Sequence, residues 1–320
     1  MSTPVEKWAE QVRAGDVRAI SRAVSAIENR SRQAEEILRK LFPYTGHAFR
    51  IGITGAPGTG KSTLVDRLAG RYRAQQQTVG IIAVDPSSPF TGGAILGDRI
   101  RMQGHATDAG IFIRSMATRG YLGGLAQATG DTALLLDAAG KQMILVETVG
   151  VGQGEIEIVR LADCTLVVLM PGMGDDVQSL KAGLMEIGDI FVLNKADREG
   201  AGRFEQQLRA ILQIVPERDG WKPPVVRTIA TENKGIDELA EQIEIFRKHF
   251  GEAHQRRARE LAHWKEWLLR MLEARLMERI GRHLSESQLE KLAAEVAARK
   301  KDPYGAVEEI LAHAGMGEKR

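Results

Sequence analysis

The chain has 320 residues, of which 43% are hydrophobic, and its formal net charge is only +2. This length suits one large domain with smaller additions, and the basic residues are too scattered to form the patch that nucleic-acid-binding proteins carry. Cys164 is the only cysteine, which excludes an intrachain disulfide and favours a reducing compartment. There is no apolar leader at the amino terminus, and no window approaches the roughly 18 apolar residues of a membrane span. We therefore expect a soluble, cytoplasmic protein that binds neither nucleic acid nor a membrane.

Residues 1–45 are predicted to form an N-terminal helical extension. Apolar side chains recur there at helical spacing: Val5, Trp8, Ala9, Val12, Ile20, Val24, Ile27, Ile37, Leu38 and Leu41. Pro43 and Gly46 then interrupt the pattern, so the extension is expected to end near them.

Between residues 46 and 250, short apolar runs alternate with helical segments. The runs are FRIGITG, TVGIIAV, GIFIRS, QMILVE, CTLVVLM, DIFVLN and PVVRTI. Because they are apolar on both sides, they are typical of buried parallel strands. Their alternation with helices predicts an α/β domain with a doubly wound, mainly parallel sheet.

From residue 251 to residue 320 the sequence predicts helices and no further strand. Three segments, which begin HQRRAREL, SESQLEKL and PYGAVEEI, have helical patterns. The first is long and carries apolar residues at helical spacing: Leu261, Trp264, Leu268, Met271, Leu272 and Leu276. This part is expected to be a C-terminal helical arm.

A phosphate-binding motif lies between the first apolar run and a helical segment. It matches G-x-x-x-x-G-K-S/T with Gly55, Ala56, Pro57, Gly58, Thr59, Gly60, Lys61 and Ser62, and Thr63 follows it. Its glycines let backbone N–H groups turn inward around a β-phosphate. Lys61 is expected to reach the β- and γ-phosphates, and Ser62 to bind Mg²⁺. A glycine-rich turn without a ligand is the alternative, which the placement between strand and helix disfavours.

A guanine-binding motif, N-K-x-D, follows the apolar run DIFVLN as Asn194, Lys195, Ala196 and Asp197. The aspartate can accept hydrogen bonds from guanine N1–H and N2–H₂, and adenine lacks this pair of donors. After the next run come Ile229, Ala230 and Thr231, which are placed to donate backbone N–H groups to guanine O6. On its own the motif is a common polar strand end, but after a phosphate loop it favours GTP.

A second acidic motif, Glu147-Thr148-Val149-Gly150, ends the run QMILVE. Many GTPases have D-x-x-G here, in which the acid holds Mg²⁺, so Glu147 is a candidate metal ligand and catalytic residue; an ordinary loop acid is the alternative. Ras-like proteins have a water-orienting glutamine directly after the glycine, where this chain has Val151. Gln153 is close by and is a catalytic candidate.

Two aspartates are further candidates for the metal site. Asp85 ends the run TVGIIAV, at the kind of strand end where doubly wound folds bind ligands, although Asp-Pro also begins turns. For Asp98 the spacing alone favours an ordinary solvated helix acid.

Several segments together resemble the MeaB/ArgK family of P-loop GTPases: VDPSSPFTGGAILGDRIRM, RSMATRGYLGGLA, ILVETVGVGQGEIEI, VLMPGMGDDVQSLKAG, VLNKAD and DPYGAVEEIL. The resemblance covers nearly the whole chain, and its most specific part is residues 85–102. Members of this family are chaperones of adenosylcobalamin-dependent acyl-CoA mutases.

The resemblance implies roles for individual residues. Ser62, Asp85, Asp98 and Glu147 match the family's Mg²⁺ and switch residues, and Asp98 gains its assignment only in this way. Residues 85–102 match switch I, residues from Thr148 onward match switch II, and residues 172–181 match a third switch that includes Lys181. Without the resemblance, Lys181 is equally well an exposed helix lysine.

The resemblance also implies partners and an assembly. Methylmalonyl-CoA mutase is the favoured partner, isobutyryl-CoA mutase or a close relative is the alternative, and an adenosyltransferase is a further candidate. Family members form homodimers through C-terminal helices, with which Trp264, Trp267 and Leu268 are consistent, although an intrachain contact would explain these residues as well.

Two functions therefore compete. The first is a GTPase that gates adenosylcobalamin loading and protects the mutase. The second is a metabolite kinase on a related P-loop fold, but no acceptor-activating aspartate is convincingly placed. A nucleic-acid-binding GTPase is disfavoured by the near-neutral charge.

Overall fold

The computed structural model describes residues 3–85, 107–117, 122–148, 162–172, 182–251 and 253–315. The chain divides into two compact units, Met1–Ala258 and Arg259–Arg320. The first unit contains the sheet and all the motifs described above. In the described ranges, no helix combines the length and the apolar character needed to cross a membrane.

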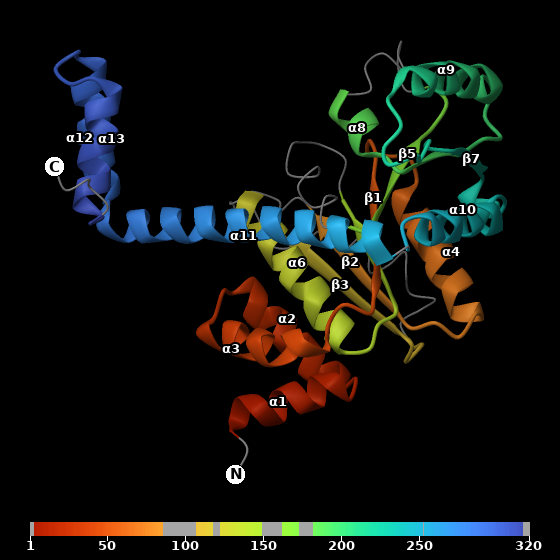
Figure 1. Cartoon of the computed structure of the whole chain (residues 1–320), viewed down its shortest axis with the longest axis horizontal. Helices are drawn as coiled ribbons and strands as arrows, with labels where there is room; N and C mark the ends of the chain where they lie inside the picture. Colours follow the sequence, from red (N-terminus) through yellow and green to blue (C-terminus); the bar gives the residue numbers. More distant parts are fainter. Residues whose placement is uncertain are drawn as a thin grey trace. The chain divides into compact units, whose positions relative to one another are not determined.

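A seven-stranded parallel sheet forms the centre of the first unit (Figure 1). Its strands are β1 (Phe49–Thr54), β2 (Val79–Asp85), β3 (Ile111–Ala117), β4 (Met143–Glu147), β5 (Cys164–Leu169), β6 (Ile190–Asn194) and β7 (Val225–Thr228). Their order is β3-β2-β4-β1-β5-β6-β7, and every pairing is parallel. Each predicted apolar run is one of these strands, so the predicted doubly wound parallel fold is confirmed. Strands β2 to β4 lie on one side of β1 and β5 to β7 on the other, an arrangement that places ligands at the carboxyl end of the central strand.

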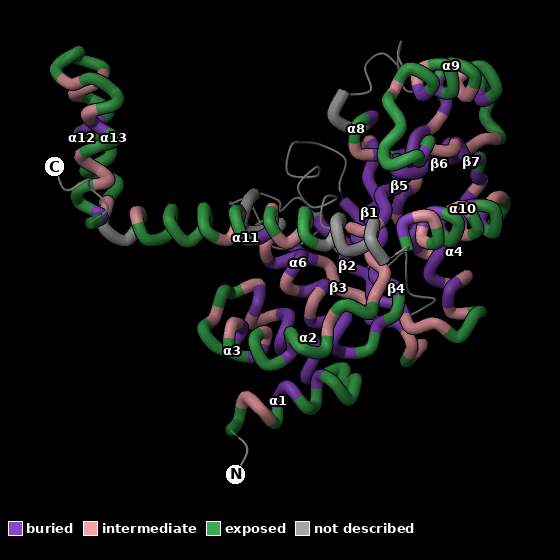
Figure 2. The backbone as a smooth tube through the Cα atoms, viewed as in Figure 1, coloured by how far each residue is buried: buried purple, intermediate pink, exposed green. Residues whose placement is uncertain are grey.

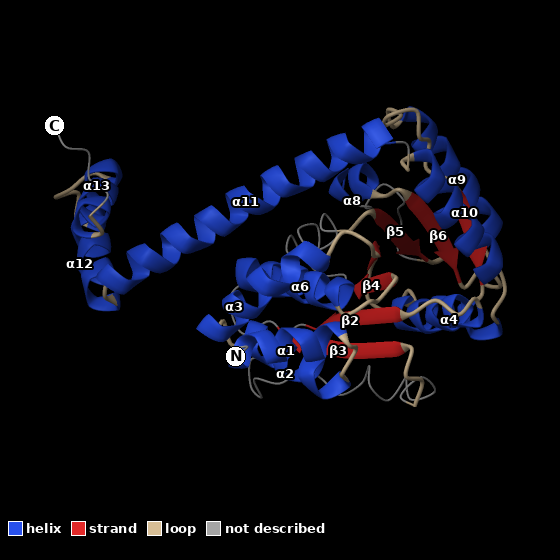
Figure 3. Ribbon diagram, turned by 60° about the horizontal axis from the view of Figure 1, so that its bottom comes forward, coloured by secondary structure: helices blue, strands red, loops and turns tan. Residues whose placement is uncertain are grey.

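Helices cover both faces of the sheet (Figure 3). One face packs against α4 (Lys61–Ala74) and α10 (Ile236–His249). On the other face, α6 (Leu122–Ala138) covers β2 to β4, while α8 (Ala182–Ile187) and α9 (Ala201–Ile214) cover β5 to β7. Strands β4, β5 and β6 are buried at every position (Figure 2), because side chains on both faces lie under helices. This explains why the strands are continuous apolar runs.

The N-terminal helices belong to the same hydrophobic core as α6. They are α1 (Pro4–Arg13), α2 (Val17–Glu28) and α3 (Arg32–Leu41), followed by a 3₁₀ turn, η1 (Phe42–Tyr44). Each α-helix begins after a residue whose side chain accepts a backbone N–H: Thr3, Asp16 and Ser31. Their apolar faces pack in one cluster with α6 and with β2 to β4. The extension is therefore a second layer over this face of the sheet.

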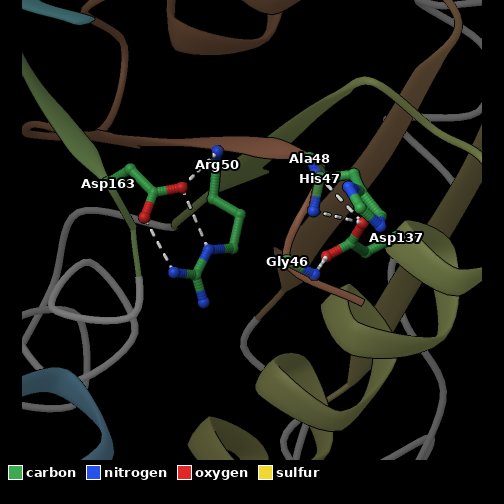
Figure 4. A network of polar contacts seen from close by, with 6 residues as sticks. All are labelled: Gly46, His47, Ala48, Arg50, Asp137 and Asp163. Carbon is green, nitrogen blue, oxygen red and sulfur yellow. Dashed lines mark hydrogen bonds and ion pairs between the residues drawn. The ribbon is translucent and has the colours of Figure 1, made fainter. Parts of the chain in front are cut away.

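Two aspartates fix the start of β1, the strand that leads into the phosphate loop (Figure 4). Asp137, near the end of α6, accepts hydrogen bonds from three consecutive backbone N–H groups: Gly46 (2.6 Å), His47 (3.2 Å) and Ala48 (3.0 Å). On β1, Arg50 donates from Nε (3.1 Å) and from Nη2 (2.7 Å) to the two oxygens of Asp163, next to the start of β5. Because charged acceptors strengthen such bonds, the network holds β1 firmly between α6 and β5.

The second unit begins within α11 (Ala253–His283) and contains α12 (Glu286–Ala297) and α13 (Pro303–His313), in agreement with the three predicted helices. Lys301 pairs with Glu295 of α12 and with Glu309 of α13 and so links these two helices. Helix α11 exposes a series of large apolar side chains: Leu261, Leu268, Leu269, Leu272, Leu276 and Met277. Of the predicted contact residues on this helix, Trp267 is buried and Leu268 is 62% exposed.

Candidate nucleotide-binding site

The loop between β1 and α4 requires glycine at two positions where it touches other strands. A Cβ on Gly55 would lie 2.1 Å from the carbonyl oxygen of Val168 in β5. Gly60 has φ +94°, and a Cβ there would lie 2.4 Å from Nδ2 of Asn194. Neither position can take a side chain without moving its neighbour, so the loop is held closely against the ends of β5 and β6.

Lys61 is near the end of the phosphate loop (residues 55–62), and its side chain reaches back to the start of the loop. Its Nζ donates to the carbonyl oxygens of Gly55 (2.8 Å) and Ala56 (3.1 Å), and the residue is only 6% exposed. Thr59 closes the loop on itself through Oγ1, which donates to the Ala56 carbonyl at 2.9 Å. A lysine held in this loop places a positive charge where a bound phosphate would lie. The helix that begins at Lys61 adds its positive end to the same site.

Ser62 and Glu147 meet beside this loop, as their predicted shared role requires. The Ser62 hydroxyl donates to Oε1 of Glu147 at 2.6 Å, and Glu147 is 6% exposed at the end of β4. A hydroxyl and a buried carboxylate are hard oxygen donors of the kind that Mg²⁺ takes. The described ranges contain no cluster of three or more His, Cys, Asp and Glu side chains that could hold a metal ion. Mg²⁺ usually combines few protein ligands with phosphate oxygens and water, so the hydroxyl and the carboxylate are a candidate part of such a site.

Asn194 connects the phosphate loop to the segment that follows β7. Its Nδ2 donates to the Thr59 carbonyl at 2.8 Å. Its Oδ1 accepts from the Thr228 hydroxyl at 3.0 Å and from the backbone N–H of Ala230 at 3.1 Å. The residue is 2% exposed. One buried side chain thus joins the predicted phosphate and base sites.

The rest of the N-K-x-D motif lies at the surface of the same region. Lys195 has a left-handed backbone, with φ +55°, and its Nζ donates to the Gly58 carbonyl at 2.6 Å. Such a conformation is uncommon outside glycine and occurs often at functional sites. Asp197 is exposed, as a carboxylate that recognises a ligand has to be. The pKa of Lys234, in the neighbouring loop, is raised chiefly by its hydrogen bond to Glu232 and by the negative charge of that carboxylate.

The base segment (residues 229–231) leads into a short 3₁₀ helix, η4 (Ala230–Glu232). Ile229 and Lys234 bond to each other through both backbone N–H groups, at 3.0 and 3.3 Å. Two residues in this region were not predicted from the sequence. Thr228 holds Asn194, and Arg67 of α4 donates from Nε to the Ala230 carbonyl at 3.1 Å. Thr228 directly precedes the predicted segment and could have been included, whereas nothing in the sequence distinguishes Arg67 from other helix arginines.

Four predicted site residues are described only in part or lie outside the described ranges. Asp85 ends β2, so its backbone is at the carboxyl edge of the sheet with the other candidates, but its side chain is not described. Asp98, Gln153 and Lys181 lie outside the described residues, and their roles stay predictions.

Comparisons with known proteins agree along the chain. The profile of the family described as "Methylmalonyl Co-A mutase-associated GTPase MeaB" matches residues 18–284. A protein of Pyrococcus abyssi that is named as a GTPase is 48% identical over 310 residues, which is 96% of each chain. The GTPase ArgK of Escherichia coli is 38% identical over 237 residues, which is 72% of each chain. A solved structure described as an LAO/AO transport system kinase has a TM-score of 0.76 and 25% identity and covers 98% of each chain. The range that the family profile matches includes every residue of the candidate site.

Proposed function

The chain belongs to the MeaB family of methylmalonyl-CoA mutase-associated P-loop GTPases, and from this premise we propose that it hydrolyses GTP with Mg²⁺ to control such a mutase. The observation that carries the GTP assignment is the position of Asn194. This side chain bonds both to the phosphate loop and to the base segment, so one nucleotide can meet both. The exposed Asp197 supplies the acceptor that distinguishes guanine from adenine.

In the proposed reaction, water attacks the γ-phosphorus, the bond to the β–γ bridging oxygen breaks, and GDP and phosphate are released. Lys61 offsets the charge on the transferring group and keeps it in line. Ser62 and Glu147, together with Asp85 and Asp98, would hold Mg²⁺, which would supply positive charge beside the phosphate oxygens. Gln153 is the candidate for placing the water. Because no glutamine follows Gly150 directly, unassisted turnover is expected at about 10⁻² s⁻¹ or below.

Transfer of the γ-phosphoryl group to a small-molecule acceptor, instead of to water, is the competing reaction. The solved structure that resembles this chain is described as a transport system kinase, and a kinase transfers phosphate to an acceptor. Incubation of the protein with γ-labelled GTP and Mg²⁺, followed by separation of the products, distinguishes the two. Free phosphate as the product supports the GTPase, whereas label on a small-molecule acceptor from a metabolite extract would replace it by a kinase.

The output of the GTPase is proposed to be control of adenosylcobalamin loading and protection of the mutase. The support is that the family is defined by its association with methylmalonyl-CoA mutase. The third switch, residues 172–181, is proposed to connect nucleotide state to the mutase. It starts at Gly172, shortly after the end of β5, and the φ angle of Gly172 is +80°, a conformation in which a side chain would be strained.

Calorimetric titration of methylmalonyl-CoA mutase into the GDP and GTP forms tests this output. Coupling between two sites is typically about 5- to 150-fold in affinity, and we expect a difference in that range. Lys181→Ala is expected to reduce the difference while nucleotide affinity is retained. Cofactor transfer, also in the presence of an adenosyltransferase, is followed by absorbance. Equal mutase affinity in both forms with unchanged transfer would leave only a GTPase. The same titration with isobutyryl-CoA mutase identifies the alternative partner.

The helices of residues 251–320, which follow the GTPase domain of residues 46–250 in the sequence, are proposed to form a homodimer arm. The support is the series of exposed apolar side chains on α11, because contiguous exposed apolar surface marks interaction sites. Sedimentation of the wild type and of a Leu268→Asp, Leu272→Asp variant tests the proposal. A dimer that dissociates in the variant is expected, and a wild-type monomer at micromolar concentration would contradict it.

A further inference from the structure

A single arginine of α4 holds one particular peptide group of the base segment. Nε of Arg67 donates to the carbonyl oxygen of Ala230 at 3.1 Å. This carbonyl and the N–H of Thr231 belong to the same peptide group. Because that group is planar and trans, its C=O and N–H point in opposite directions. The same carbonyl also accepts the backbone N–H of Asn233, at 3.3 Å. Arg67 and this loop contact therefore together set the direction in which the Thr231 N–H points, and Arg67 supplies the shorter of the two bonds.

The other two N–H groups of the base segment are used within the protein. The N–H of Ile229 donates to the Lys234 carbonyl at 3.0 Å, and that of Ala230 donates to Oδ1 of Asn194 at 3.1 Å. Ala230 is 2% exposed, whereas Thr231 is an exposed residue. Of the three amides, the one that Arg67 orients is thus the one on an exposed residue.

We propose that Arg67 is a positioning residue for guanine recognition, which directs the Thr231 N–H toward the O6 oxygen of the base. The inference rests on the proposed function, because it assumes a guanine nucleotide between the phosphate loop and the base segment. The positive charge of Arg67 at the carbonyl also polarises the peptide and makes its N–H a stronger donor. The helix that receives the phosphates thereby also orients a donor to the base.

Other contacts restrain the loop on both sides of this peptide. At Gly235, φ is +75°, and a Cβ would lie 2.0 Å from the Arg227 carbonyl, so the turn that ends the loop has one conformation. The backbone bridge between Ile229 and Lys234 joins the two ends of the loop. Within the loop, the hydrogen bond from Arg67 connects the Ala230 carbonyl to α4, the helix that begins at the phosphate loop.

The test compares Arg67→Ala with Arg71→Ala as a matched control. Arg71 lies one helical turn further along α4 and pairs with Asp237, whose side chain is 80% exposed, so this pair is on the surface. The probes are GDP, IDP and 6-thio-GDP, and dissociation constants are measured by calorimetry. IDP keeps O6 but lacks the 2-amino group, whereas 6-thio-GDP keeps the donors that face Asp197 and replaces O6 with sulfur, a weaker acceptor.

For Arg67→Ala we expect GDP and IDP to bind about 3- to 10-fold more weakly, since one oriented hydrogen bond is lost. Binding of 6-thio-GDP is expected to change much less, and Arg71→Ala is expected to bind all three probes as the wild type does. Arg67→Lys, which keeps a cationic donor, is expected to recover part of the loss for GDP and IDP. Thermal unfolding of each variant checks that it is folded.

Equal weakening of all three probes in Arg67→Ala would overturn the inference, because a merely structural arginine affects them alike. Unchanged GDP binding would also overturn it. If the wild-type protein binds none of these nucleotides, the proposed guanine site itself fails, and this result is distinct from failure of the arginine's role alone.

Discussion

Replacement of Asn194 by alanine is expected to destabilise the protein even without nucleotide. The side chain is 2% exposed and makes three hydrogen bonds, at 2.8, 3.0 and 3.1 Å. At about 1 kcal/mol for each bond, the variant should lose about 3 kcal/mol of unfolding free energy, and more if water does not reach the partners left behind. In a domain of this size, each kcal/mol lowers the unfolding midpoint by about 2–4 °C, so we expect a decrease of about 6–12 °C.

Asp197→Ala is the matched control for this experiment, because it lies in the same motif but is exposed. Surface substitutions usually change stability by no more than about 0.5 kcal/mol, so its midpoint in the absence of nucleotide should stay near that of the wild type. With GTP and Mg²⁺ the control should also melt below the wild type, since it loses the stabilisation that bound nucleotide gives. Calorimetric or fluorescence melting of both variants, with and without GTP, provides the measurement. If nucleotide-free Asn194→Ala melts at the wild-type midpoint, Asn194 does not join the two loops as argued.

The remaining predictions concern recognition and hydrolysis. Asp197→Asn should weaken GTP binding by about 1–3 kcal/mol and shift the preference toward xanthosine triphosphate, because an unpaired buried group is left on the base; competition titrations measure both, and wild-type affinity for GTP would refute the assignment. Lys61→Ala should abolish phosphate release, since it removes the charge that offsets the transferring group, and retained turnover would exclude that role. Gly60→Ala should impair nucleotide binding and folding together, because its Cβ would lie 2.4 Å from the Asn194 amide at φ +94°; wild-type melting and binding would show that the loop can relax.

Much of the fold could be predicted because strands that are buried on both faces of a sheet are continuous runs of apolar residues. Strand β6, for example, is buried at every position, and its run is uninterrupted by polar residues before Asn194. The order of the strands could not be predicted. Parallel runs of similar composition carry no sign of their neighbours, so the sequence does not indicate that β1 lies between β4 and β5. The packing of the N-terminal helices against α6 was equally hidden, because helical periodicity identifies an apolar face but not its partner.

The candidate site was predictable where the chemistry depends on local backbone. The phosphate loop and the N-K-x-D motif each follow one strand end. Within each motif, the spacing of the residues in the sequence therefore determines how they are placed in the structure. Contacts between distant segments were not predictable in this way. Arg67 bonds to Ala230, which is far from it in sequence. Thr228 bonds to Asn194, which is at the end of another strand. From the sequence we expected the backbone N–H groups of residues 229–231 to be donors to the base. In the structure, two of these groups, those of Ile229 and Ala230, donate to acceptors within the protein.

The ties between the two halves of the site bear on how base recognition relates to catalysis. Asn194 bonds to the Thr59 carbonyl in the phosphate loop, and Lys195 bonds to the carbonyl of Gly58 beside it. Any energy that a guanine base adds by ordering this motif therefore also restrains the loop that positions the phosphates. Linkage makes the effect reciprocal, so phosphates that order the loop also favour the conformation that binds the base. A poorly matched base should therefore weaken catalysis as well as binding. It loses its own hydrogen bonds, and it also leaves the loop around Lys61 less restrained during phosphoryl transfer.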